Sequence, residues 1–315
     1  MAFNEITEII EESFALVIAG LRRLGKKTPY YVNYDITSDC TQKCEACYFE
    51  KTYDKKGKID LTDEEWLEIF KRDKKAGVSN VFLTGGEPSL RPEVIEMAHN
   101  IFTTVTIISN GTKKIPENIE RRIFISLDGP KEVHNKTRGV NSYDKVIENI
   151  KGDKRVILSP CISTKTYKHI PELVKIAKDL GVSGVMFSLY TSHQGQDDSL
   201  YLKGHQLEET LSMFKRLKKQ YGDFIFTTNG IIDSFREKQY IETCPMSKAN
   251  PRFASYYPDL TKKEPCTLGE GVECETCGCI APIIPCRMKK LDVETLLMAQ
   301  RMYPLKYRVR RHGSR

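Results

Sequence analysis

The sequence predicts an α/β fold in which short parallel strands alternate with helices. Six β-rich runs alternate with amphipathic stretches along residues 30–221, and glycines stand where helices would end, at Gly77 and Gly181. Consecutive strand–helix units imply parallel strands joined by right-handed crossovers. Because six units are fewer than the eight of a closed barrel, we expect an open, partial (βα)6 barrel similar to the TIM type.

The elements follow in order along the chain. Residues 5–24 carry apolar side chains every three or four positions, with acids early and bases late, which predicts an amphipathic N-terminal helix. Strands are expected at 30–36, 80–83, 104–109, 122–127, 155–161 and 184–189. Helices are expected at 63–76, 92–101, 143–151, 168–180 and 205–221, with a poorer pattern at 116–121.

The regular alternation breaks at about residue 221. Residues 244–286 combine prolines, short polar runs and cysteines, and they lack the apolar content for a core of their own. We therefore expect three segments: an N-terminal amphipathic helix (1–28), a partial barrel (29–222) and an irregular, Cys-rich C-terminal extension with a basic tail (223–315). Metal or packing against the barrel would hold the extension in place.

Composition limits the functional class. The 315 residues are 40% hydrophobic and 29% charged, as in ordinary globular proteins. No stretch near the N-terminus has the length of a membrane span or the basic start of a secretory signal, so the sequence predicts a cytoplasmic protein.

The net charge of +7 equals the excess of bases over acids within residues 287–315, so the remaining body is neutral. A neutral body argues against nucleic-acid binding. The tail reads as a solvated terminus, and the alternative is attraction to an anionic partner or membrane surface.

Three of the ten cysteines stand together after the first expected strand, as Cys40-x3-Cys44-x2-Cys47. Thiolates are soft ligands that suit zinc or iron–sulfur clusters. Three thiols on a [4Fe–4S] cube leave one iron open to a non-protein ligand. The alternative is a zinc site that a distant cysteine completes.

Polar or glycine-rich segments also follow the next three strands. Gly85-Gly86-Glu87-Pro88 follows the second, Ser109-Asn110-Gly111 the third, and Asp128-Gly129 the fourth. Ligands of such folds bind at the carboxyl ends of the strands, so these loops are expected to meet at one mouth. The two glycines allow close backbone approach, and the Glu87 carboxylate can accept a hydrogen bond from an ammonium group.

The CTQKCEAC and GGEP motifs, each at the right strand end and in order, resemble the radical S-adenosylmethionine (radical SAM) superfamily over about residues 30–189. One departure is Ala46, where many members have an aromatic residue; Tyr48 follows the third cysteine instead. The resemblance implies that Cys40, Cys44 and Cys47 hold a [4Fe–4S] cluster and act in catalysis. It also implies contacts to SAM or the substrate pocket by Gly85, Gly86, Glu87, Ser109, Asn110, Ser126 and Asp128.

The same resemblance implies a reaction. One electron from the cluster cleaves SAM, and the 5′-deoxyadenosyl radical abstracts hydrogen from, or adds to, an organic substrate. The usual electron donor of the family is a low-potential ferredoxin or flavodoxin. Arg138 matches an arginine of the maturase-like branch, and its alternative interpretation is a surface turn; Cys161 reads as an inert buried residue.

Six further cysteines lie between Cys244 and Cys286. Four of them, Cys266, Cys274, Cys277 and Cys279, fall within fourteen residues and predict zinc or a second iron–sulfur cluster rather than free thiols. They resemble the Cys-rich extensions of radical SAM maturases, without their full spacing.

The substrate class has two candidates. The order of N-terminal helix, first strand and cysteine trio resembles the branch that acts on polycyclic lipids. The basic tail and the amphipathic helix fit a lipid substrate with peripheral membrane contact, whereas the C-terminal cysteines favour a peptide. A functional alternative is a non-catalytic, zinc-binding interaction module, which predicts zinc without iron and no SAM binding.

Overall fold

The computed structural model describes residues 29–53, 59–195, 198–247 and 249–303. The predicted N-terminal helix and most of the basic tail lie outside these residues. Seven parallel strands form one sheet in the order β7-β5-β4-β3-β2-β1-β9, and β6 and β8 form a small second sheet. The strands are β1 (Tyr31–Asp35), β2 (Asn80–Thr84), β3 (Thr104–Ser109), β4 (Arg122–Ile125), β5 (Val156–Leu158), β6 (Cys161–Ile162), β7 (Gly184–Val185), β8 (Ser188–Leu189) and β9 (Phe253–Tyr256).

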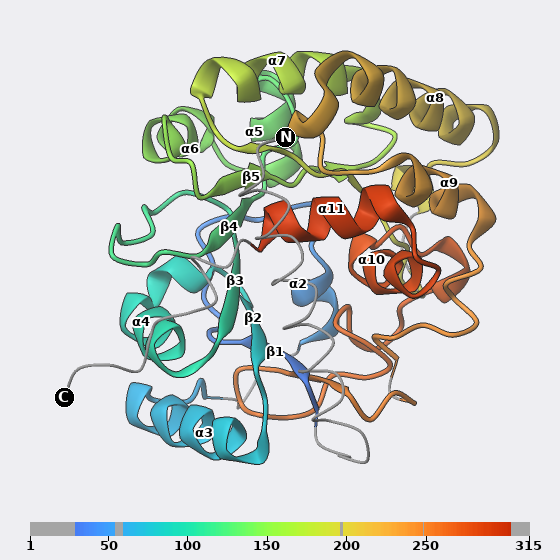
Figure 1. Cartoon of the computed structure of the whole chain (residues 1–315). Helices are drawn as coiled ribbons and strands as arrows, with labels where there is room; N and C mark the ends of the chain where they lie inside the picture. The colour runs from blue at the N-terminus through green and yellow to red at the C-terminus, as the bar shows by residue number, and fades with distance from the viewer. Residues whose placement is uncertain (1–28, 54–58, 196–197, 248, 304–315) are drawn as a thin grey trace, which may run out of the picture.

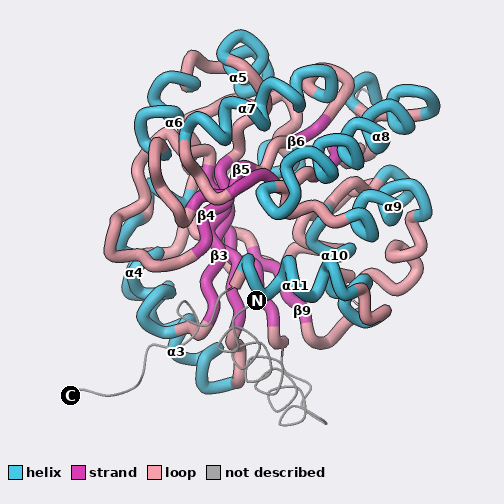
Figure 2. Tube along the Cα trace, turned by 45° about the horizontal axis from the view of Figure 1, so that its top comes forward, coloured by secondary structure: helices cyan, strands magenta, loops and turns pink. Residues whose placement is uncertain are grey.

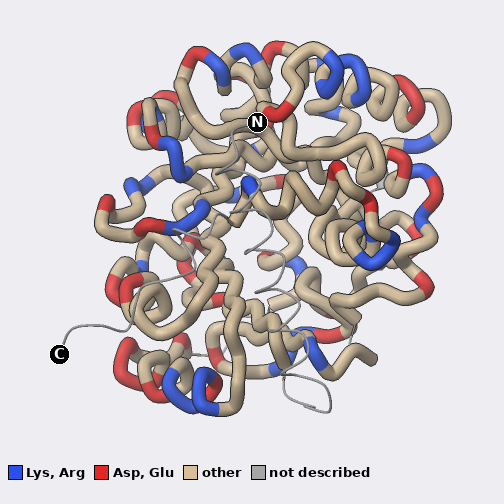
Figure 3. Tube along the Cα trace, viewed as in Figure 1, with Lys and Arg blue, Asp and Glu red and all other residues tan. Residues whose placement is uncertain are grey.

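Helices pack around this sheet (Figure 1). They are α2 (Tyr48–Thr52), α3 (Asp63–Ala76), α4 (Pro92–Ile101), α5 (Lys131–Arg138), α6 (Tyr143–Ile150), α7 (Ile170–Leu180), α8 (Gly204–Tyr221), α9 (Asn229–Glu237), α10 (Ile280–Lys289) and α11 (Val293–Met302). Acidic and basic residues lie side by side on α3 and α8 (Figure 3), so neither helix offers a surface of one charge sign. In the part of the chain described, no helix has both the length and the apolar content that a membrane crossing requires.

The predicted α/β class is confirmed, with the six expected strands parallel and in sequence order from β1 to β7. The open sheet with its outer helices is seen in Figure 2. The helices predicted at 63–76 and 92–101 have the observed bounds, and α3 begins with a capping box in which Thr62 and Glu65 satisfy each other's backbone N–H groups.

Two predicted strands are interrupted. The run 155–161 divides into β5 and β6 because Pro160 cannot donate to the ladder, and the run 184–189 divides into β7 and β8. The helix expected at 116–121 is wrong: the segment makes only short turns, such as the bond from the Ile119 N–H to the Pro116 carbonyl.

The extension is less irregular than the sequence indicates. Strand β9 pairs with β1 in parallel, from Tyr31 opposite Phe253 to Tyr34 opposite Tyr256. At the other edge of the sheet, Ile225 forms a parallel bridge with Val185 of β7. The extension therefore borders both edges of the sheet, and α11 crosses in front of the strands (Figure 1).

The core is continuous across the expected segment boundary. Ile280, Ile283 and Met298 of the extension belong to the same buried cluster as the strands and helices of the barrel. Packing against the barrel therefore holds the extension, which was one of the two predicted alternatives, the other being metal. The division of the chain at residue 222 stays a prediction.

Alternating strand residues separate two faces of the sheet. Val32, Tyr34 and Ile36 are buried on the helix side, where the Tyr34 ring packs edge-on against Trp66. Asn33 and Asp35 lie on the other face and make polar contacts with Ser255 and Thr84. This polar face leads to the carboxyl ends of the strands, where the predicted site residues are found.

Candidate active site

The cysteine loop, residues 38–47, follows β1 and is held at its start by the loop after β2. The Gly86 N–H donates to the Thr37 carbonyl at 2.8 Å, and the Glu87 N–H donates to the Asp39 carbonyl at 2.7 Å. The Asp60 carboxylate adds a bond from the Ser38 N–H at 2.6 Å. The loop that carries the three cysteines is thus fixed to its neighbours by main-chain contacts.

The two glycines of the GGEP motif are required by this close contact. A Cβ on Gly85 would lie 2.5 Å from the Thr37 carbonyl oxygen, and Gly85 also has a φ of +126°. A Cβ on Gly86 would lie 2.2 Å from the Asp39 carbonyl oxygen. Any side chain at these positions would push the cysteine loop away from β2.

Glu87 joins the loops after β2 and β3. Its carboxylate is buried and accepts hydrogen bonds from the Ser89 N–H (2.8 Å), the Ser109 hydroxyl (2.7 Å) and the Asn110 N–H (2.6 Å). Burial raises the pKa of this carboxyl, although these bonds oppose the shift. The described contacts of Glu87 are therefore internal, and its expected contact with an ammonium group of SAM stays a prediction.

Asn110 connects this arrangement to the first cysteine. Its side-chain amide donates to Cys40 Sγ at 3.7 Å and to the Thr41 hydroxyl at 3.0 Å. The Ser126 N–H, after β4, donates to the Ser109 carbonyl at 3.0 Å. The loops after β1, β2, β3 and β4 therefore meet at one end of the sheet, as their positions in the sequence predict.

The second half of the cysteine loop rests on the C-terminal end of α5. The Lys43 N–H donates to the Arg138 carbonyl and the Glu45 N–H to the Thr137 carbonyl, both at 3.1 Å. Gly139, with a φ of +70°, ends the helix, and a Cβ there would lie 2.2 Å from the Lys43 carbonyl oxygen. Cys44 lies between these two anchoring bonds.

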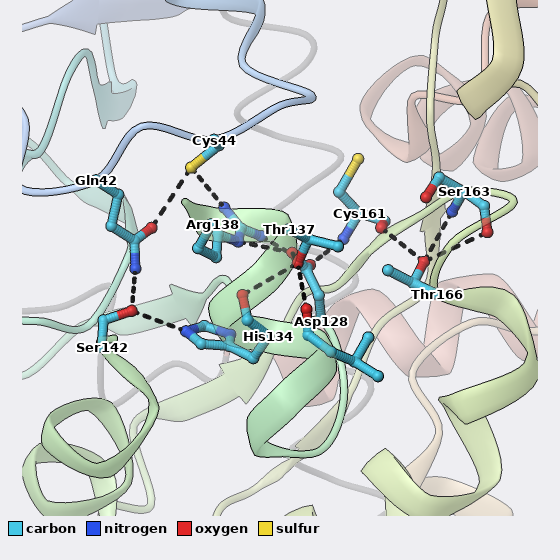
Figure 4. Close-up of polar contacts among 11 residues, drawn as sticks. Gln42, Cys44, Asp128, His134, Thr137, Arg138, Ser142, Cys161, Ser163 and Thr166 are labelled. Atoms are coloured by element: carbon cyan, nitrogen blue, oxygen red, sulfur yellow. Dashed lines mark hydrogen bonds and ion pairs between the residues drawn. The ribbon is translucent and has the colours of Figure 1, made fainter. Parts of the chain in front are cut away.

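Asp128 and Arg138 form a buried ion pair beside Cys44 (Figure 4). Arg138 Nε and Nη2 bind the two Asp128 oxygens at 2.6 and 2.7 Å, and Arg138 Nη1 lies 3.8 Å from Cys44 Sγ. Burial raises the pKa of the Asp128 carboxyl, but Arg138 outweighs burial and holds that pKa below its usual range. The surface-turn interpretation of Arg138 is wrong, because its side chain is only 12% exposed.

The Asp128 carboxylate is bound largely by its own chain. Besides Arg138, it accepts from the Cys161 N–H at 2.9 Å. The Thr137 hydroxyl lies 3.2 Å from Asp128, but its single proton also has the Val133 carbonyl as an acceptor at 3.0 Å. A contact between Asp128 and SAM would therefore have to share a carboxylate that already binds Arg138 and the start of β6.

A second polar chain reaches Cys44 from the other side (Figure 4). The Cys44 thiol donates to Gln42 Oε1 at 3.5 Å, Gln42 Nε2 donates to the Ser142 hydroxyl at 2.9 Å, and that hydroxyl lies 3.1 Å from His134 Nε2. Burial, helped by the nearby Arg138 charge, lowers the pKa of His134 to about 4. The imidazole is therefore neutral in the folded protein at neutral pH.

The sequence-based interpretation of Cys161 needs correction. The residue opens β6 and is partly exposed, and its backbone N–H binds Asp128, whose carboxylate also binds Arg138. Burial raises the pKa of its thiol to about 12. Cys161 thus lies beside the candidate site and not in the apolar core. In the sequence, the one feature that could have indicated this location is its position at the end of an expected strand.

The three predicted cluster ligands occupy one loop at the mouth of the sheet. Cys47 caps the start of α2, where its sulfur accepts a bond from the Glu50 N–H at 3.5 Å. Among the described residues, no three Cys, His, Asp or Glu side chains converge closely enough to hold a metal ion. The donor set nevertheless fits an iron–sulfur cluster in its chemistry, because it supplies three partly exposed soft thiols from one anchored loop.

A buried lysine from the extension lies next to this loop, and no motif in the sequence had indicated it. Lys263 Nζ is 2.6 Å from Asp35 Oδ2, and both side chains are fully buried. The ammonium also lies over the rings of Tyr48 (4.7 Å) and Tyr257 (5.1 Å). Tyr48 directly follows Cys47, so this pair connects the extension to the cysteine loop.

The C-terminal cysteines gather at the base of α10. Cys279 caps that helix, and the Tyr240 hydroxyl donates to the Cys277 carbonyl at 2.5 Å. Burial raises the pKa of Cys244 to about 11 and that of Cys266 to about 12, and in both cases the thiols of Cys274 and Cys277 raise it further. These thiols influence the pKa of Cys244 electrostatically, although its distance in sequence left Cys244 out of the predicted set.

The chain is similar to known proteins in sequence and in fold. The model of the radical SAM superfamily matches residues 34–157, which carry β1 to β5 and the loops described above. Over these residues the chain is similar to the radical SAM superfamily. A related sequence is the AdoMet-dependent heme synthase of Methanosarcina barkeri, with 26% identity over 209 residues, covering 61% of this chain and 59% of the relative.

Other radical SAM relatives match shorter segments. A probable GTP 3′,8-cyclase of Methanopyrus kandleri is 30% identical over 164 residues, which are 47% of this chain and 53% of the relative. The sporulation killing factor maturation protein SkfB of Bacillus subtilis is 29% identical over 128 residues, 37% of this chain and 30% of the relative. The chain spans about three-fifths or less of the length of these three relatives.

Solved structures share the fold. Streptococcus suis SuiB bound to S-adenosylmethionine aligns with a TM-score of 0.55 at 17% identity, covering 74% of this chain and 59% of SuiB. Native anSMEcpe with bound AdoMet aligns with a TM-score of 0.58 at 18% identity, covering 77% of this chain and 76% of that one.

Proposed function

We propose that this protein is a radical SAM enzyme that holds a [4Fe–4S] cluster through Cys40, Cys44 and Cys47 and binds SAM beside it. When bound, the two groups supply a one-electron cleavage of SAM that generates a carbon-centred radical for attack on an organic substrate. The observation that carries the proposal is the anchoring of the cysteine loop by the loops after β2 and β3 and by α5.

In this proposal the chain's own residues bind and orient the two groups. Gly85 and Gly86 bring the second loop against the cysteine loop, and Glu87 fixes the third loop to the second through Ser109 and Asn110. We assign Ser126 and Asp128 to the wall of the same pocket. Because both Asp128 oxygens bind the Arg138 guanidinium, the role of Asp128 is to position Arg138.

The proposed substrate class rests on the structural neighbours and not on contacts within the site. SuiB has been solved bound to the precursor peptide SuiA, and anSMEcpe with bound AdoMet and a Cp18Cys peptide. We propose a peptide substrate on this basis, in preference to a lipid, because the C-terminal cysteines resemble those of radical SAM maturases and also favour a peptide. A low-potential ferredoxin or flavodoxin would deliver the electron.

The substrate proposal is tested by what stimulates SAM cleavage. A mixed-sequence peptide library and a polycyclic triterpene in detergent would each be added to the reduced, SAM-bound enzyme. Isotope-labelled SAM would reveal adenosyl transfer or hydrogen exchange into either pool. Label in the lipid but not in the peptides would contradict the proposal.

We propose further that the C-terminal cysteines hold a second metal group, either zinc or a second iron–sulfur cluster. The support is the set of four thiols within fourteen residues, Cys266, Cys274, Cys277 and Cys279, which favours four thiolate ligands.

Both metal proposals are tested by reconstitution without oxygen, followed by analysis of iron, sulfide and zinc per chain. The C40A/C44A/C47A variant is expected to lose four irons, and the C266A/C274A/C277A variant to lose the second group only. The C161A variant is the matched control, because its thiol lies beside the site without belonging to either set. A protein that takes up zinc and no iron would support the non-catalytic alternative instead.

A further inference from the structure

Arg138 is a buried cation aimed at one of the proposed cluster ligands. Its Nη1 lies 3.8 Å from Cys44 Sγ, while Nε and Nη2 are held by the two oxygens of Asp128 at 2.6 and 2.7 Å. The two side chains are 12% and 4% exposed. The carboxylate holds one edge of the guanidinium through two parallel hydrogen bonds, which fixes the plane of the group. The third nitrogen, Nη1, therefore keeps its direction toward the sulfur.

The main chain fixes the same distance independently. The Lys43 N–H binds the carbonyl of Arg138 itself, and the Glu45 N–H binds the carbonyl of Thr137, both at 3.1 Å. Cys44 lies between Lys43 and Glu45, so the residue that carries the sulfur and the residue that carries the guanidinium are joined through one helix end. A merely structural ion pair between Asp128 and Arg138 would not need the third nitrogen to face a thiol.

Hydrogen bonds and positive charge next to a cluster sulfur favour the reduced, more negative state of the cluster, and burial strengthens both effects. Asp128 moderates the charge of Arg138, and Lys51 adds a positive charge near Cys47. We propose that Arg138 is a positioning residue that raises the reduction potential of the cluster through Cys44, with Asp128 as its counter-ion. This inference rests on the proposed function.

The test is a redox titration of the reconstituted protein without SAM, followed by the EPR signal of the reduced cluster. Arg138→Met is expected to lower the reduction equilibrium at least tenfold, which is about 59 mV for a one-electron couple. Asp128→Asn is expected to shift the potential in the opposite direction, because it leaves the guanidinium charge uncompensated. Arg138→Lys keeps the charge without the fork and is expected to lie between the wild type and Arg138→Met.

Lys51→Met is the matched control. It removes a positive charge near Cys47 whose described contact is with the Tyr190 ring, 5.6 Å from the ring centroid, and not with a cluster sulfur. Its shift is expected to be smaller than that of Arg138→Met. Equal shifts for the two variants, or an Arg138→Met protein with full iron content and an unchanged potential, would overturn the inference. If Arg138→Met does not fold, unchanged potentials in Arg138→Lys and Asp128→Asn would overturn it too. A wild-type protein that takes up no iron would instead overturn the proposed function itself.

Discussion

Two carboxylates at the mouth of the sheet bind residues of their own chain. Glu87 fastens the third strand-end loop to the second, and Asp128 holds Arg138 and the start of β6. At the scale of single residues, these acids shape the site by ordering its loops. The two glycines of the GGEP motif act differently, because they let the second loop lie against the cysteine loop.

One residue-scale prediction concerns His134, whose folded-state pKa of about 4 lies below the ordinary 6.5. Between these two values the unfolded chain binds a proton that the folded chain does not, so stability falls as pH falls from about 6.5 to about 4. The effect is on the order of 2–3 kcal/mol. Chemical unfolding of the His134→Gln variant over this range should show a flatter pH dependence than that of the wild type.

The control for this prediction is His205→Gln, which changes an exposed histidine at the start of α8. That variant should keep the pH dependence of the wild type. An identical pH profile for His134→Gln and the wild type would show that the buried imidazole does not carry the effect.

The strand-end elements were the part of the site that the sequence could predict. Parallel strands place their carboxyl ends together, so four loops after four successive strands had to meet. The short helix α5 was missed because only His134 among its eight residues is buried, which leaves no apolar pattern to detect. Arg138 therefore looked like a surface residue, although its helix end carries the cysteine loop.

Elements that depend on contacts far apart in sequence were also missed. Strand β9 lies in a proline-rich segment of weak periodicity and becomes a strand only by pairing with β1, more than 200 residues earlier. Lys263 is buried only because Asp35 and two tyrosine rings receive it. Neither the pairing of β9 nor the burial of Lys263 can be predicted from the residues next to it in the sequence.

The element-scale prediction concerns the close contact between the GGEP loop and the cysteine loop. Gly86→Ala would place a Cβ 2.2 Å from the Asp39 carbonyl oxygen, so the cysteine loop must move. We expect a loss of about 1–3 kcal/mol in the free energy of unfolding and a clearly lower iron content after reconstitution. Unfolding curves and iron analysis measure the two effects.

Gly152→Ala separates this steric effect from ordinary backbone strain. Gly152 has a φ of +77° and open space around its Cβ position, so alanine there should cost about 1 kcal/mol and leave the iron content unchanged. Full iron loading of Gly86→Ala would contradict the account of the two loops.

At the scale of the whole molecule, the C-terminal extension completes the sheet. It borders β1 through β9 and β7 through Ile225, and it shares the hydrophobic core. The ion pair between Lys263 and Asp35 is a buried polar contact between the extension and the barrel, and its ammonium lies over the ring of Tyr48, which directly follows Cys47. Folding of the barrel and placement of the extension should therefore be coupled.

Removal of Lys263 tests this coupling. Lys263→Met leaves the Asp35 carboxylate buried without its cation, which should lower the free energy of unfolding by about 3–5 kcal/mol. The double variant Asp35→Asn/Lys263→Met should recover much of this loss, because neither buried charge is left. Urea unfolding of the metal-free protein gives both values.

Lys71→Met is the matched control, since it breaks an exposed pair with Glu68 and should change stability by less than about 0.5 kcal/mol. A Lys263→Met protein as stable as this control would show that the extension is placed without the ion pair.

The most direct test of the proposed radical SAM chemistry is the formation of 5′-deoxyadenosine. The protein would be purified without oxygen, reconstituted with iron and sulfide, and incubated with dithionite and SAM. Cys44→Ala would be compared with Cys286→Ala, which changes a cysteine of α10 far along the chain from the cysteine loop. We predict 5′-deoxyadenosine from the wild type and from Cys286→Ala, and none above background from Cys44→Ala. Equal yields from the two variants, or no product from an iron-loaded wild type, would contradict the proposed function.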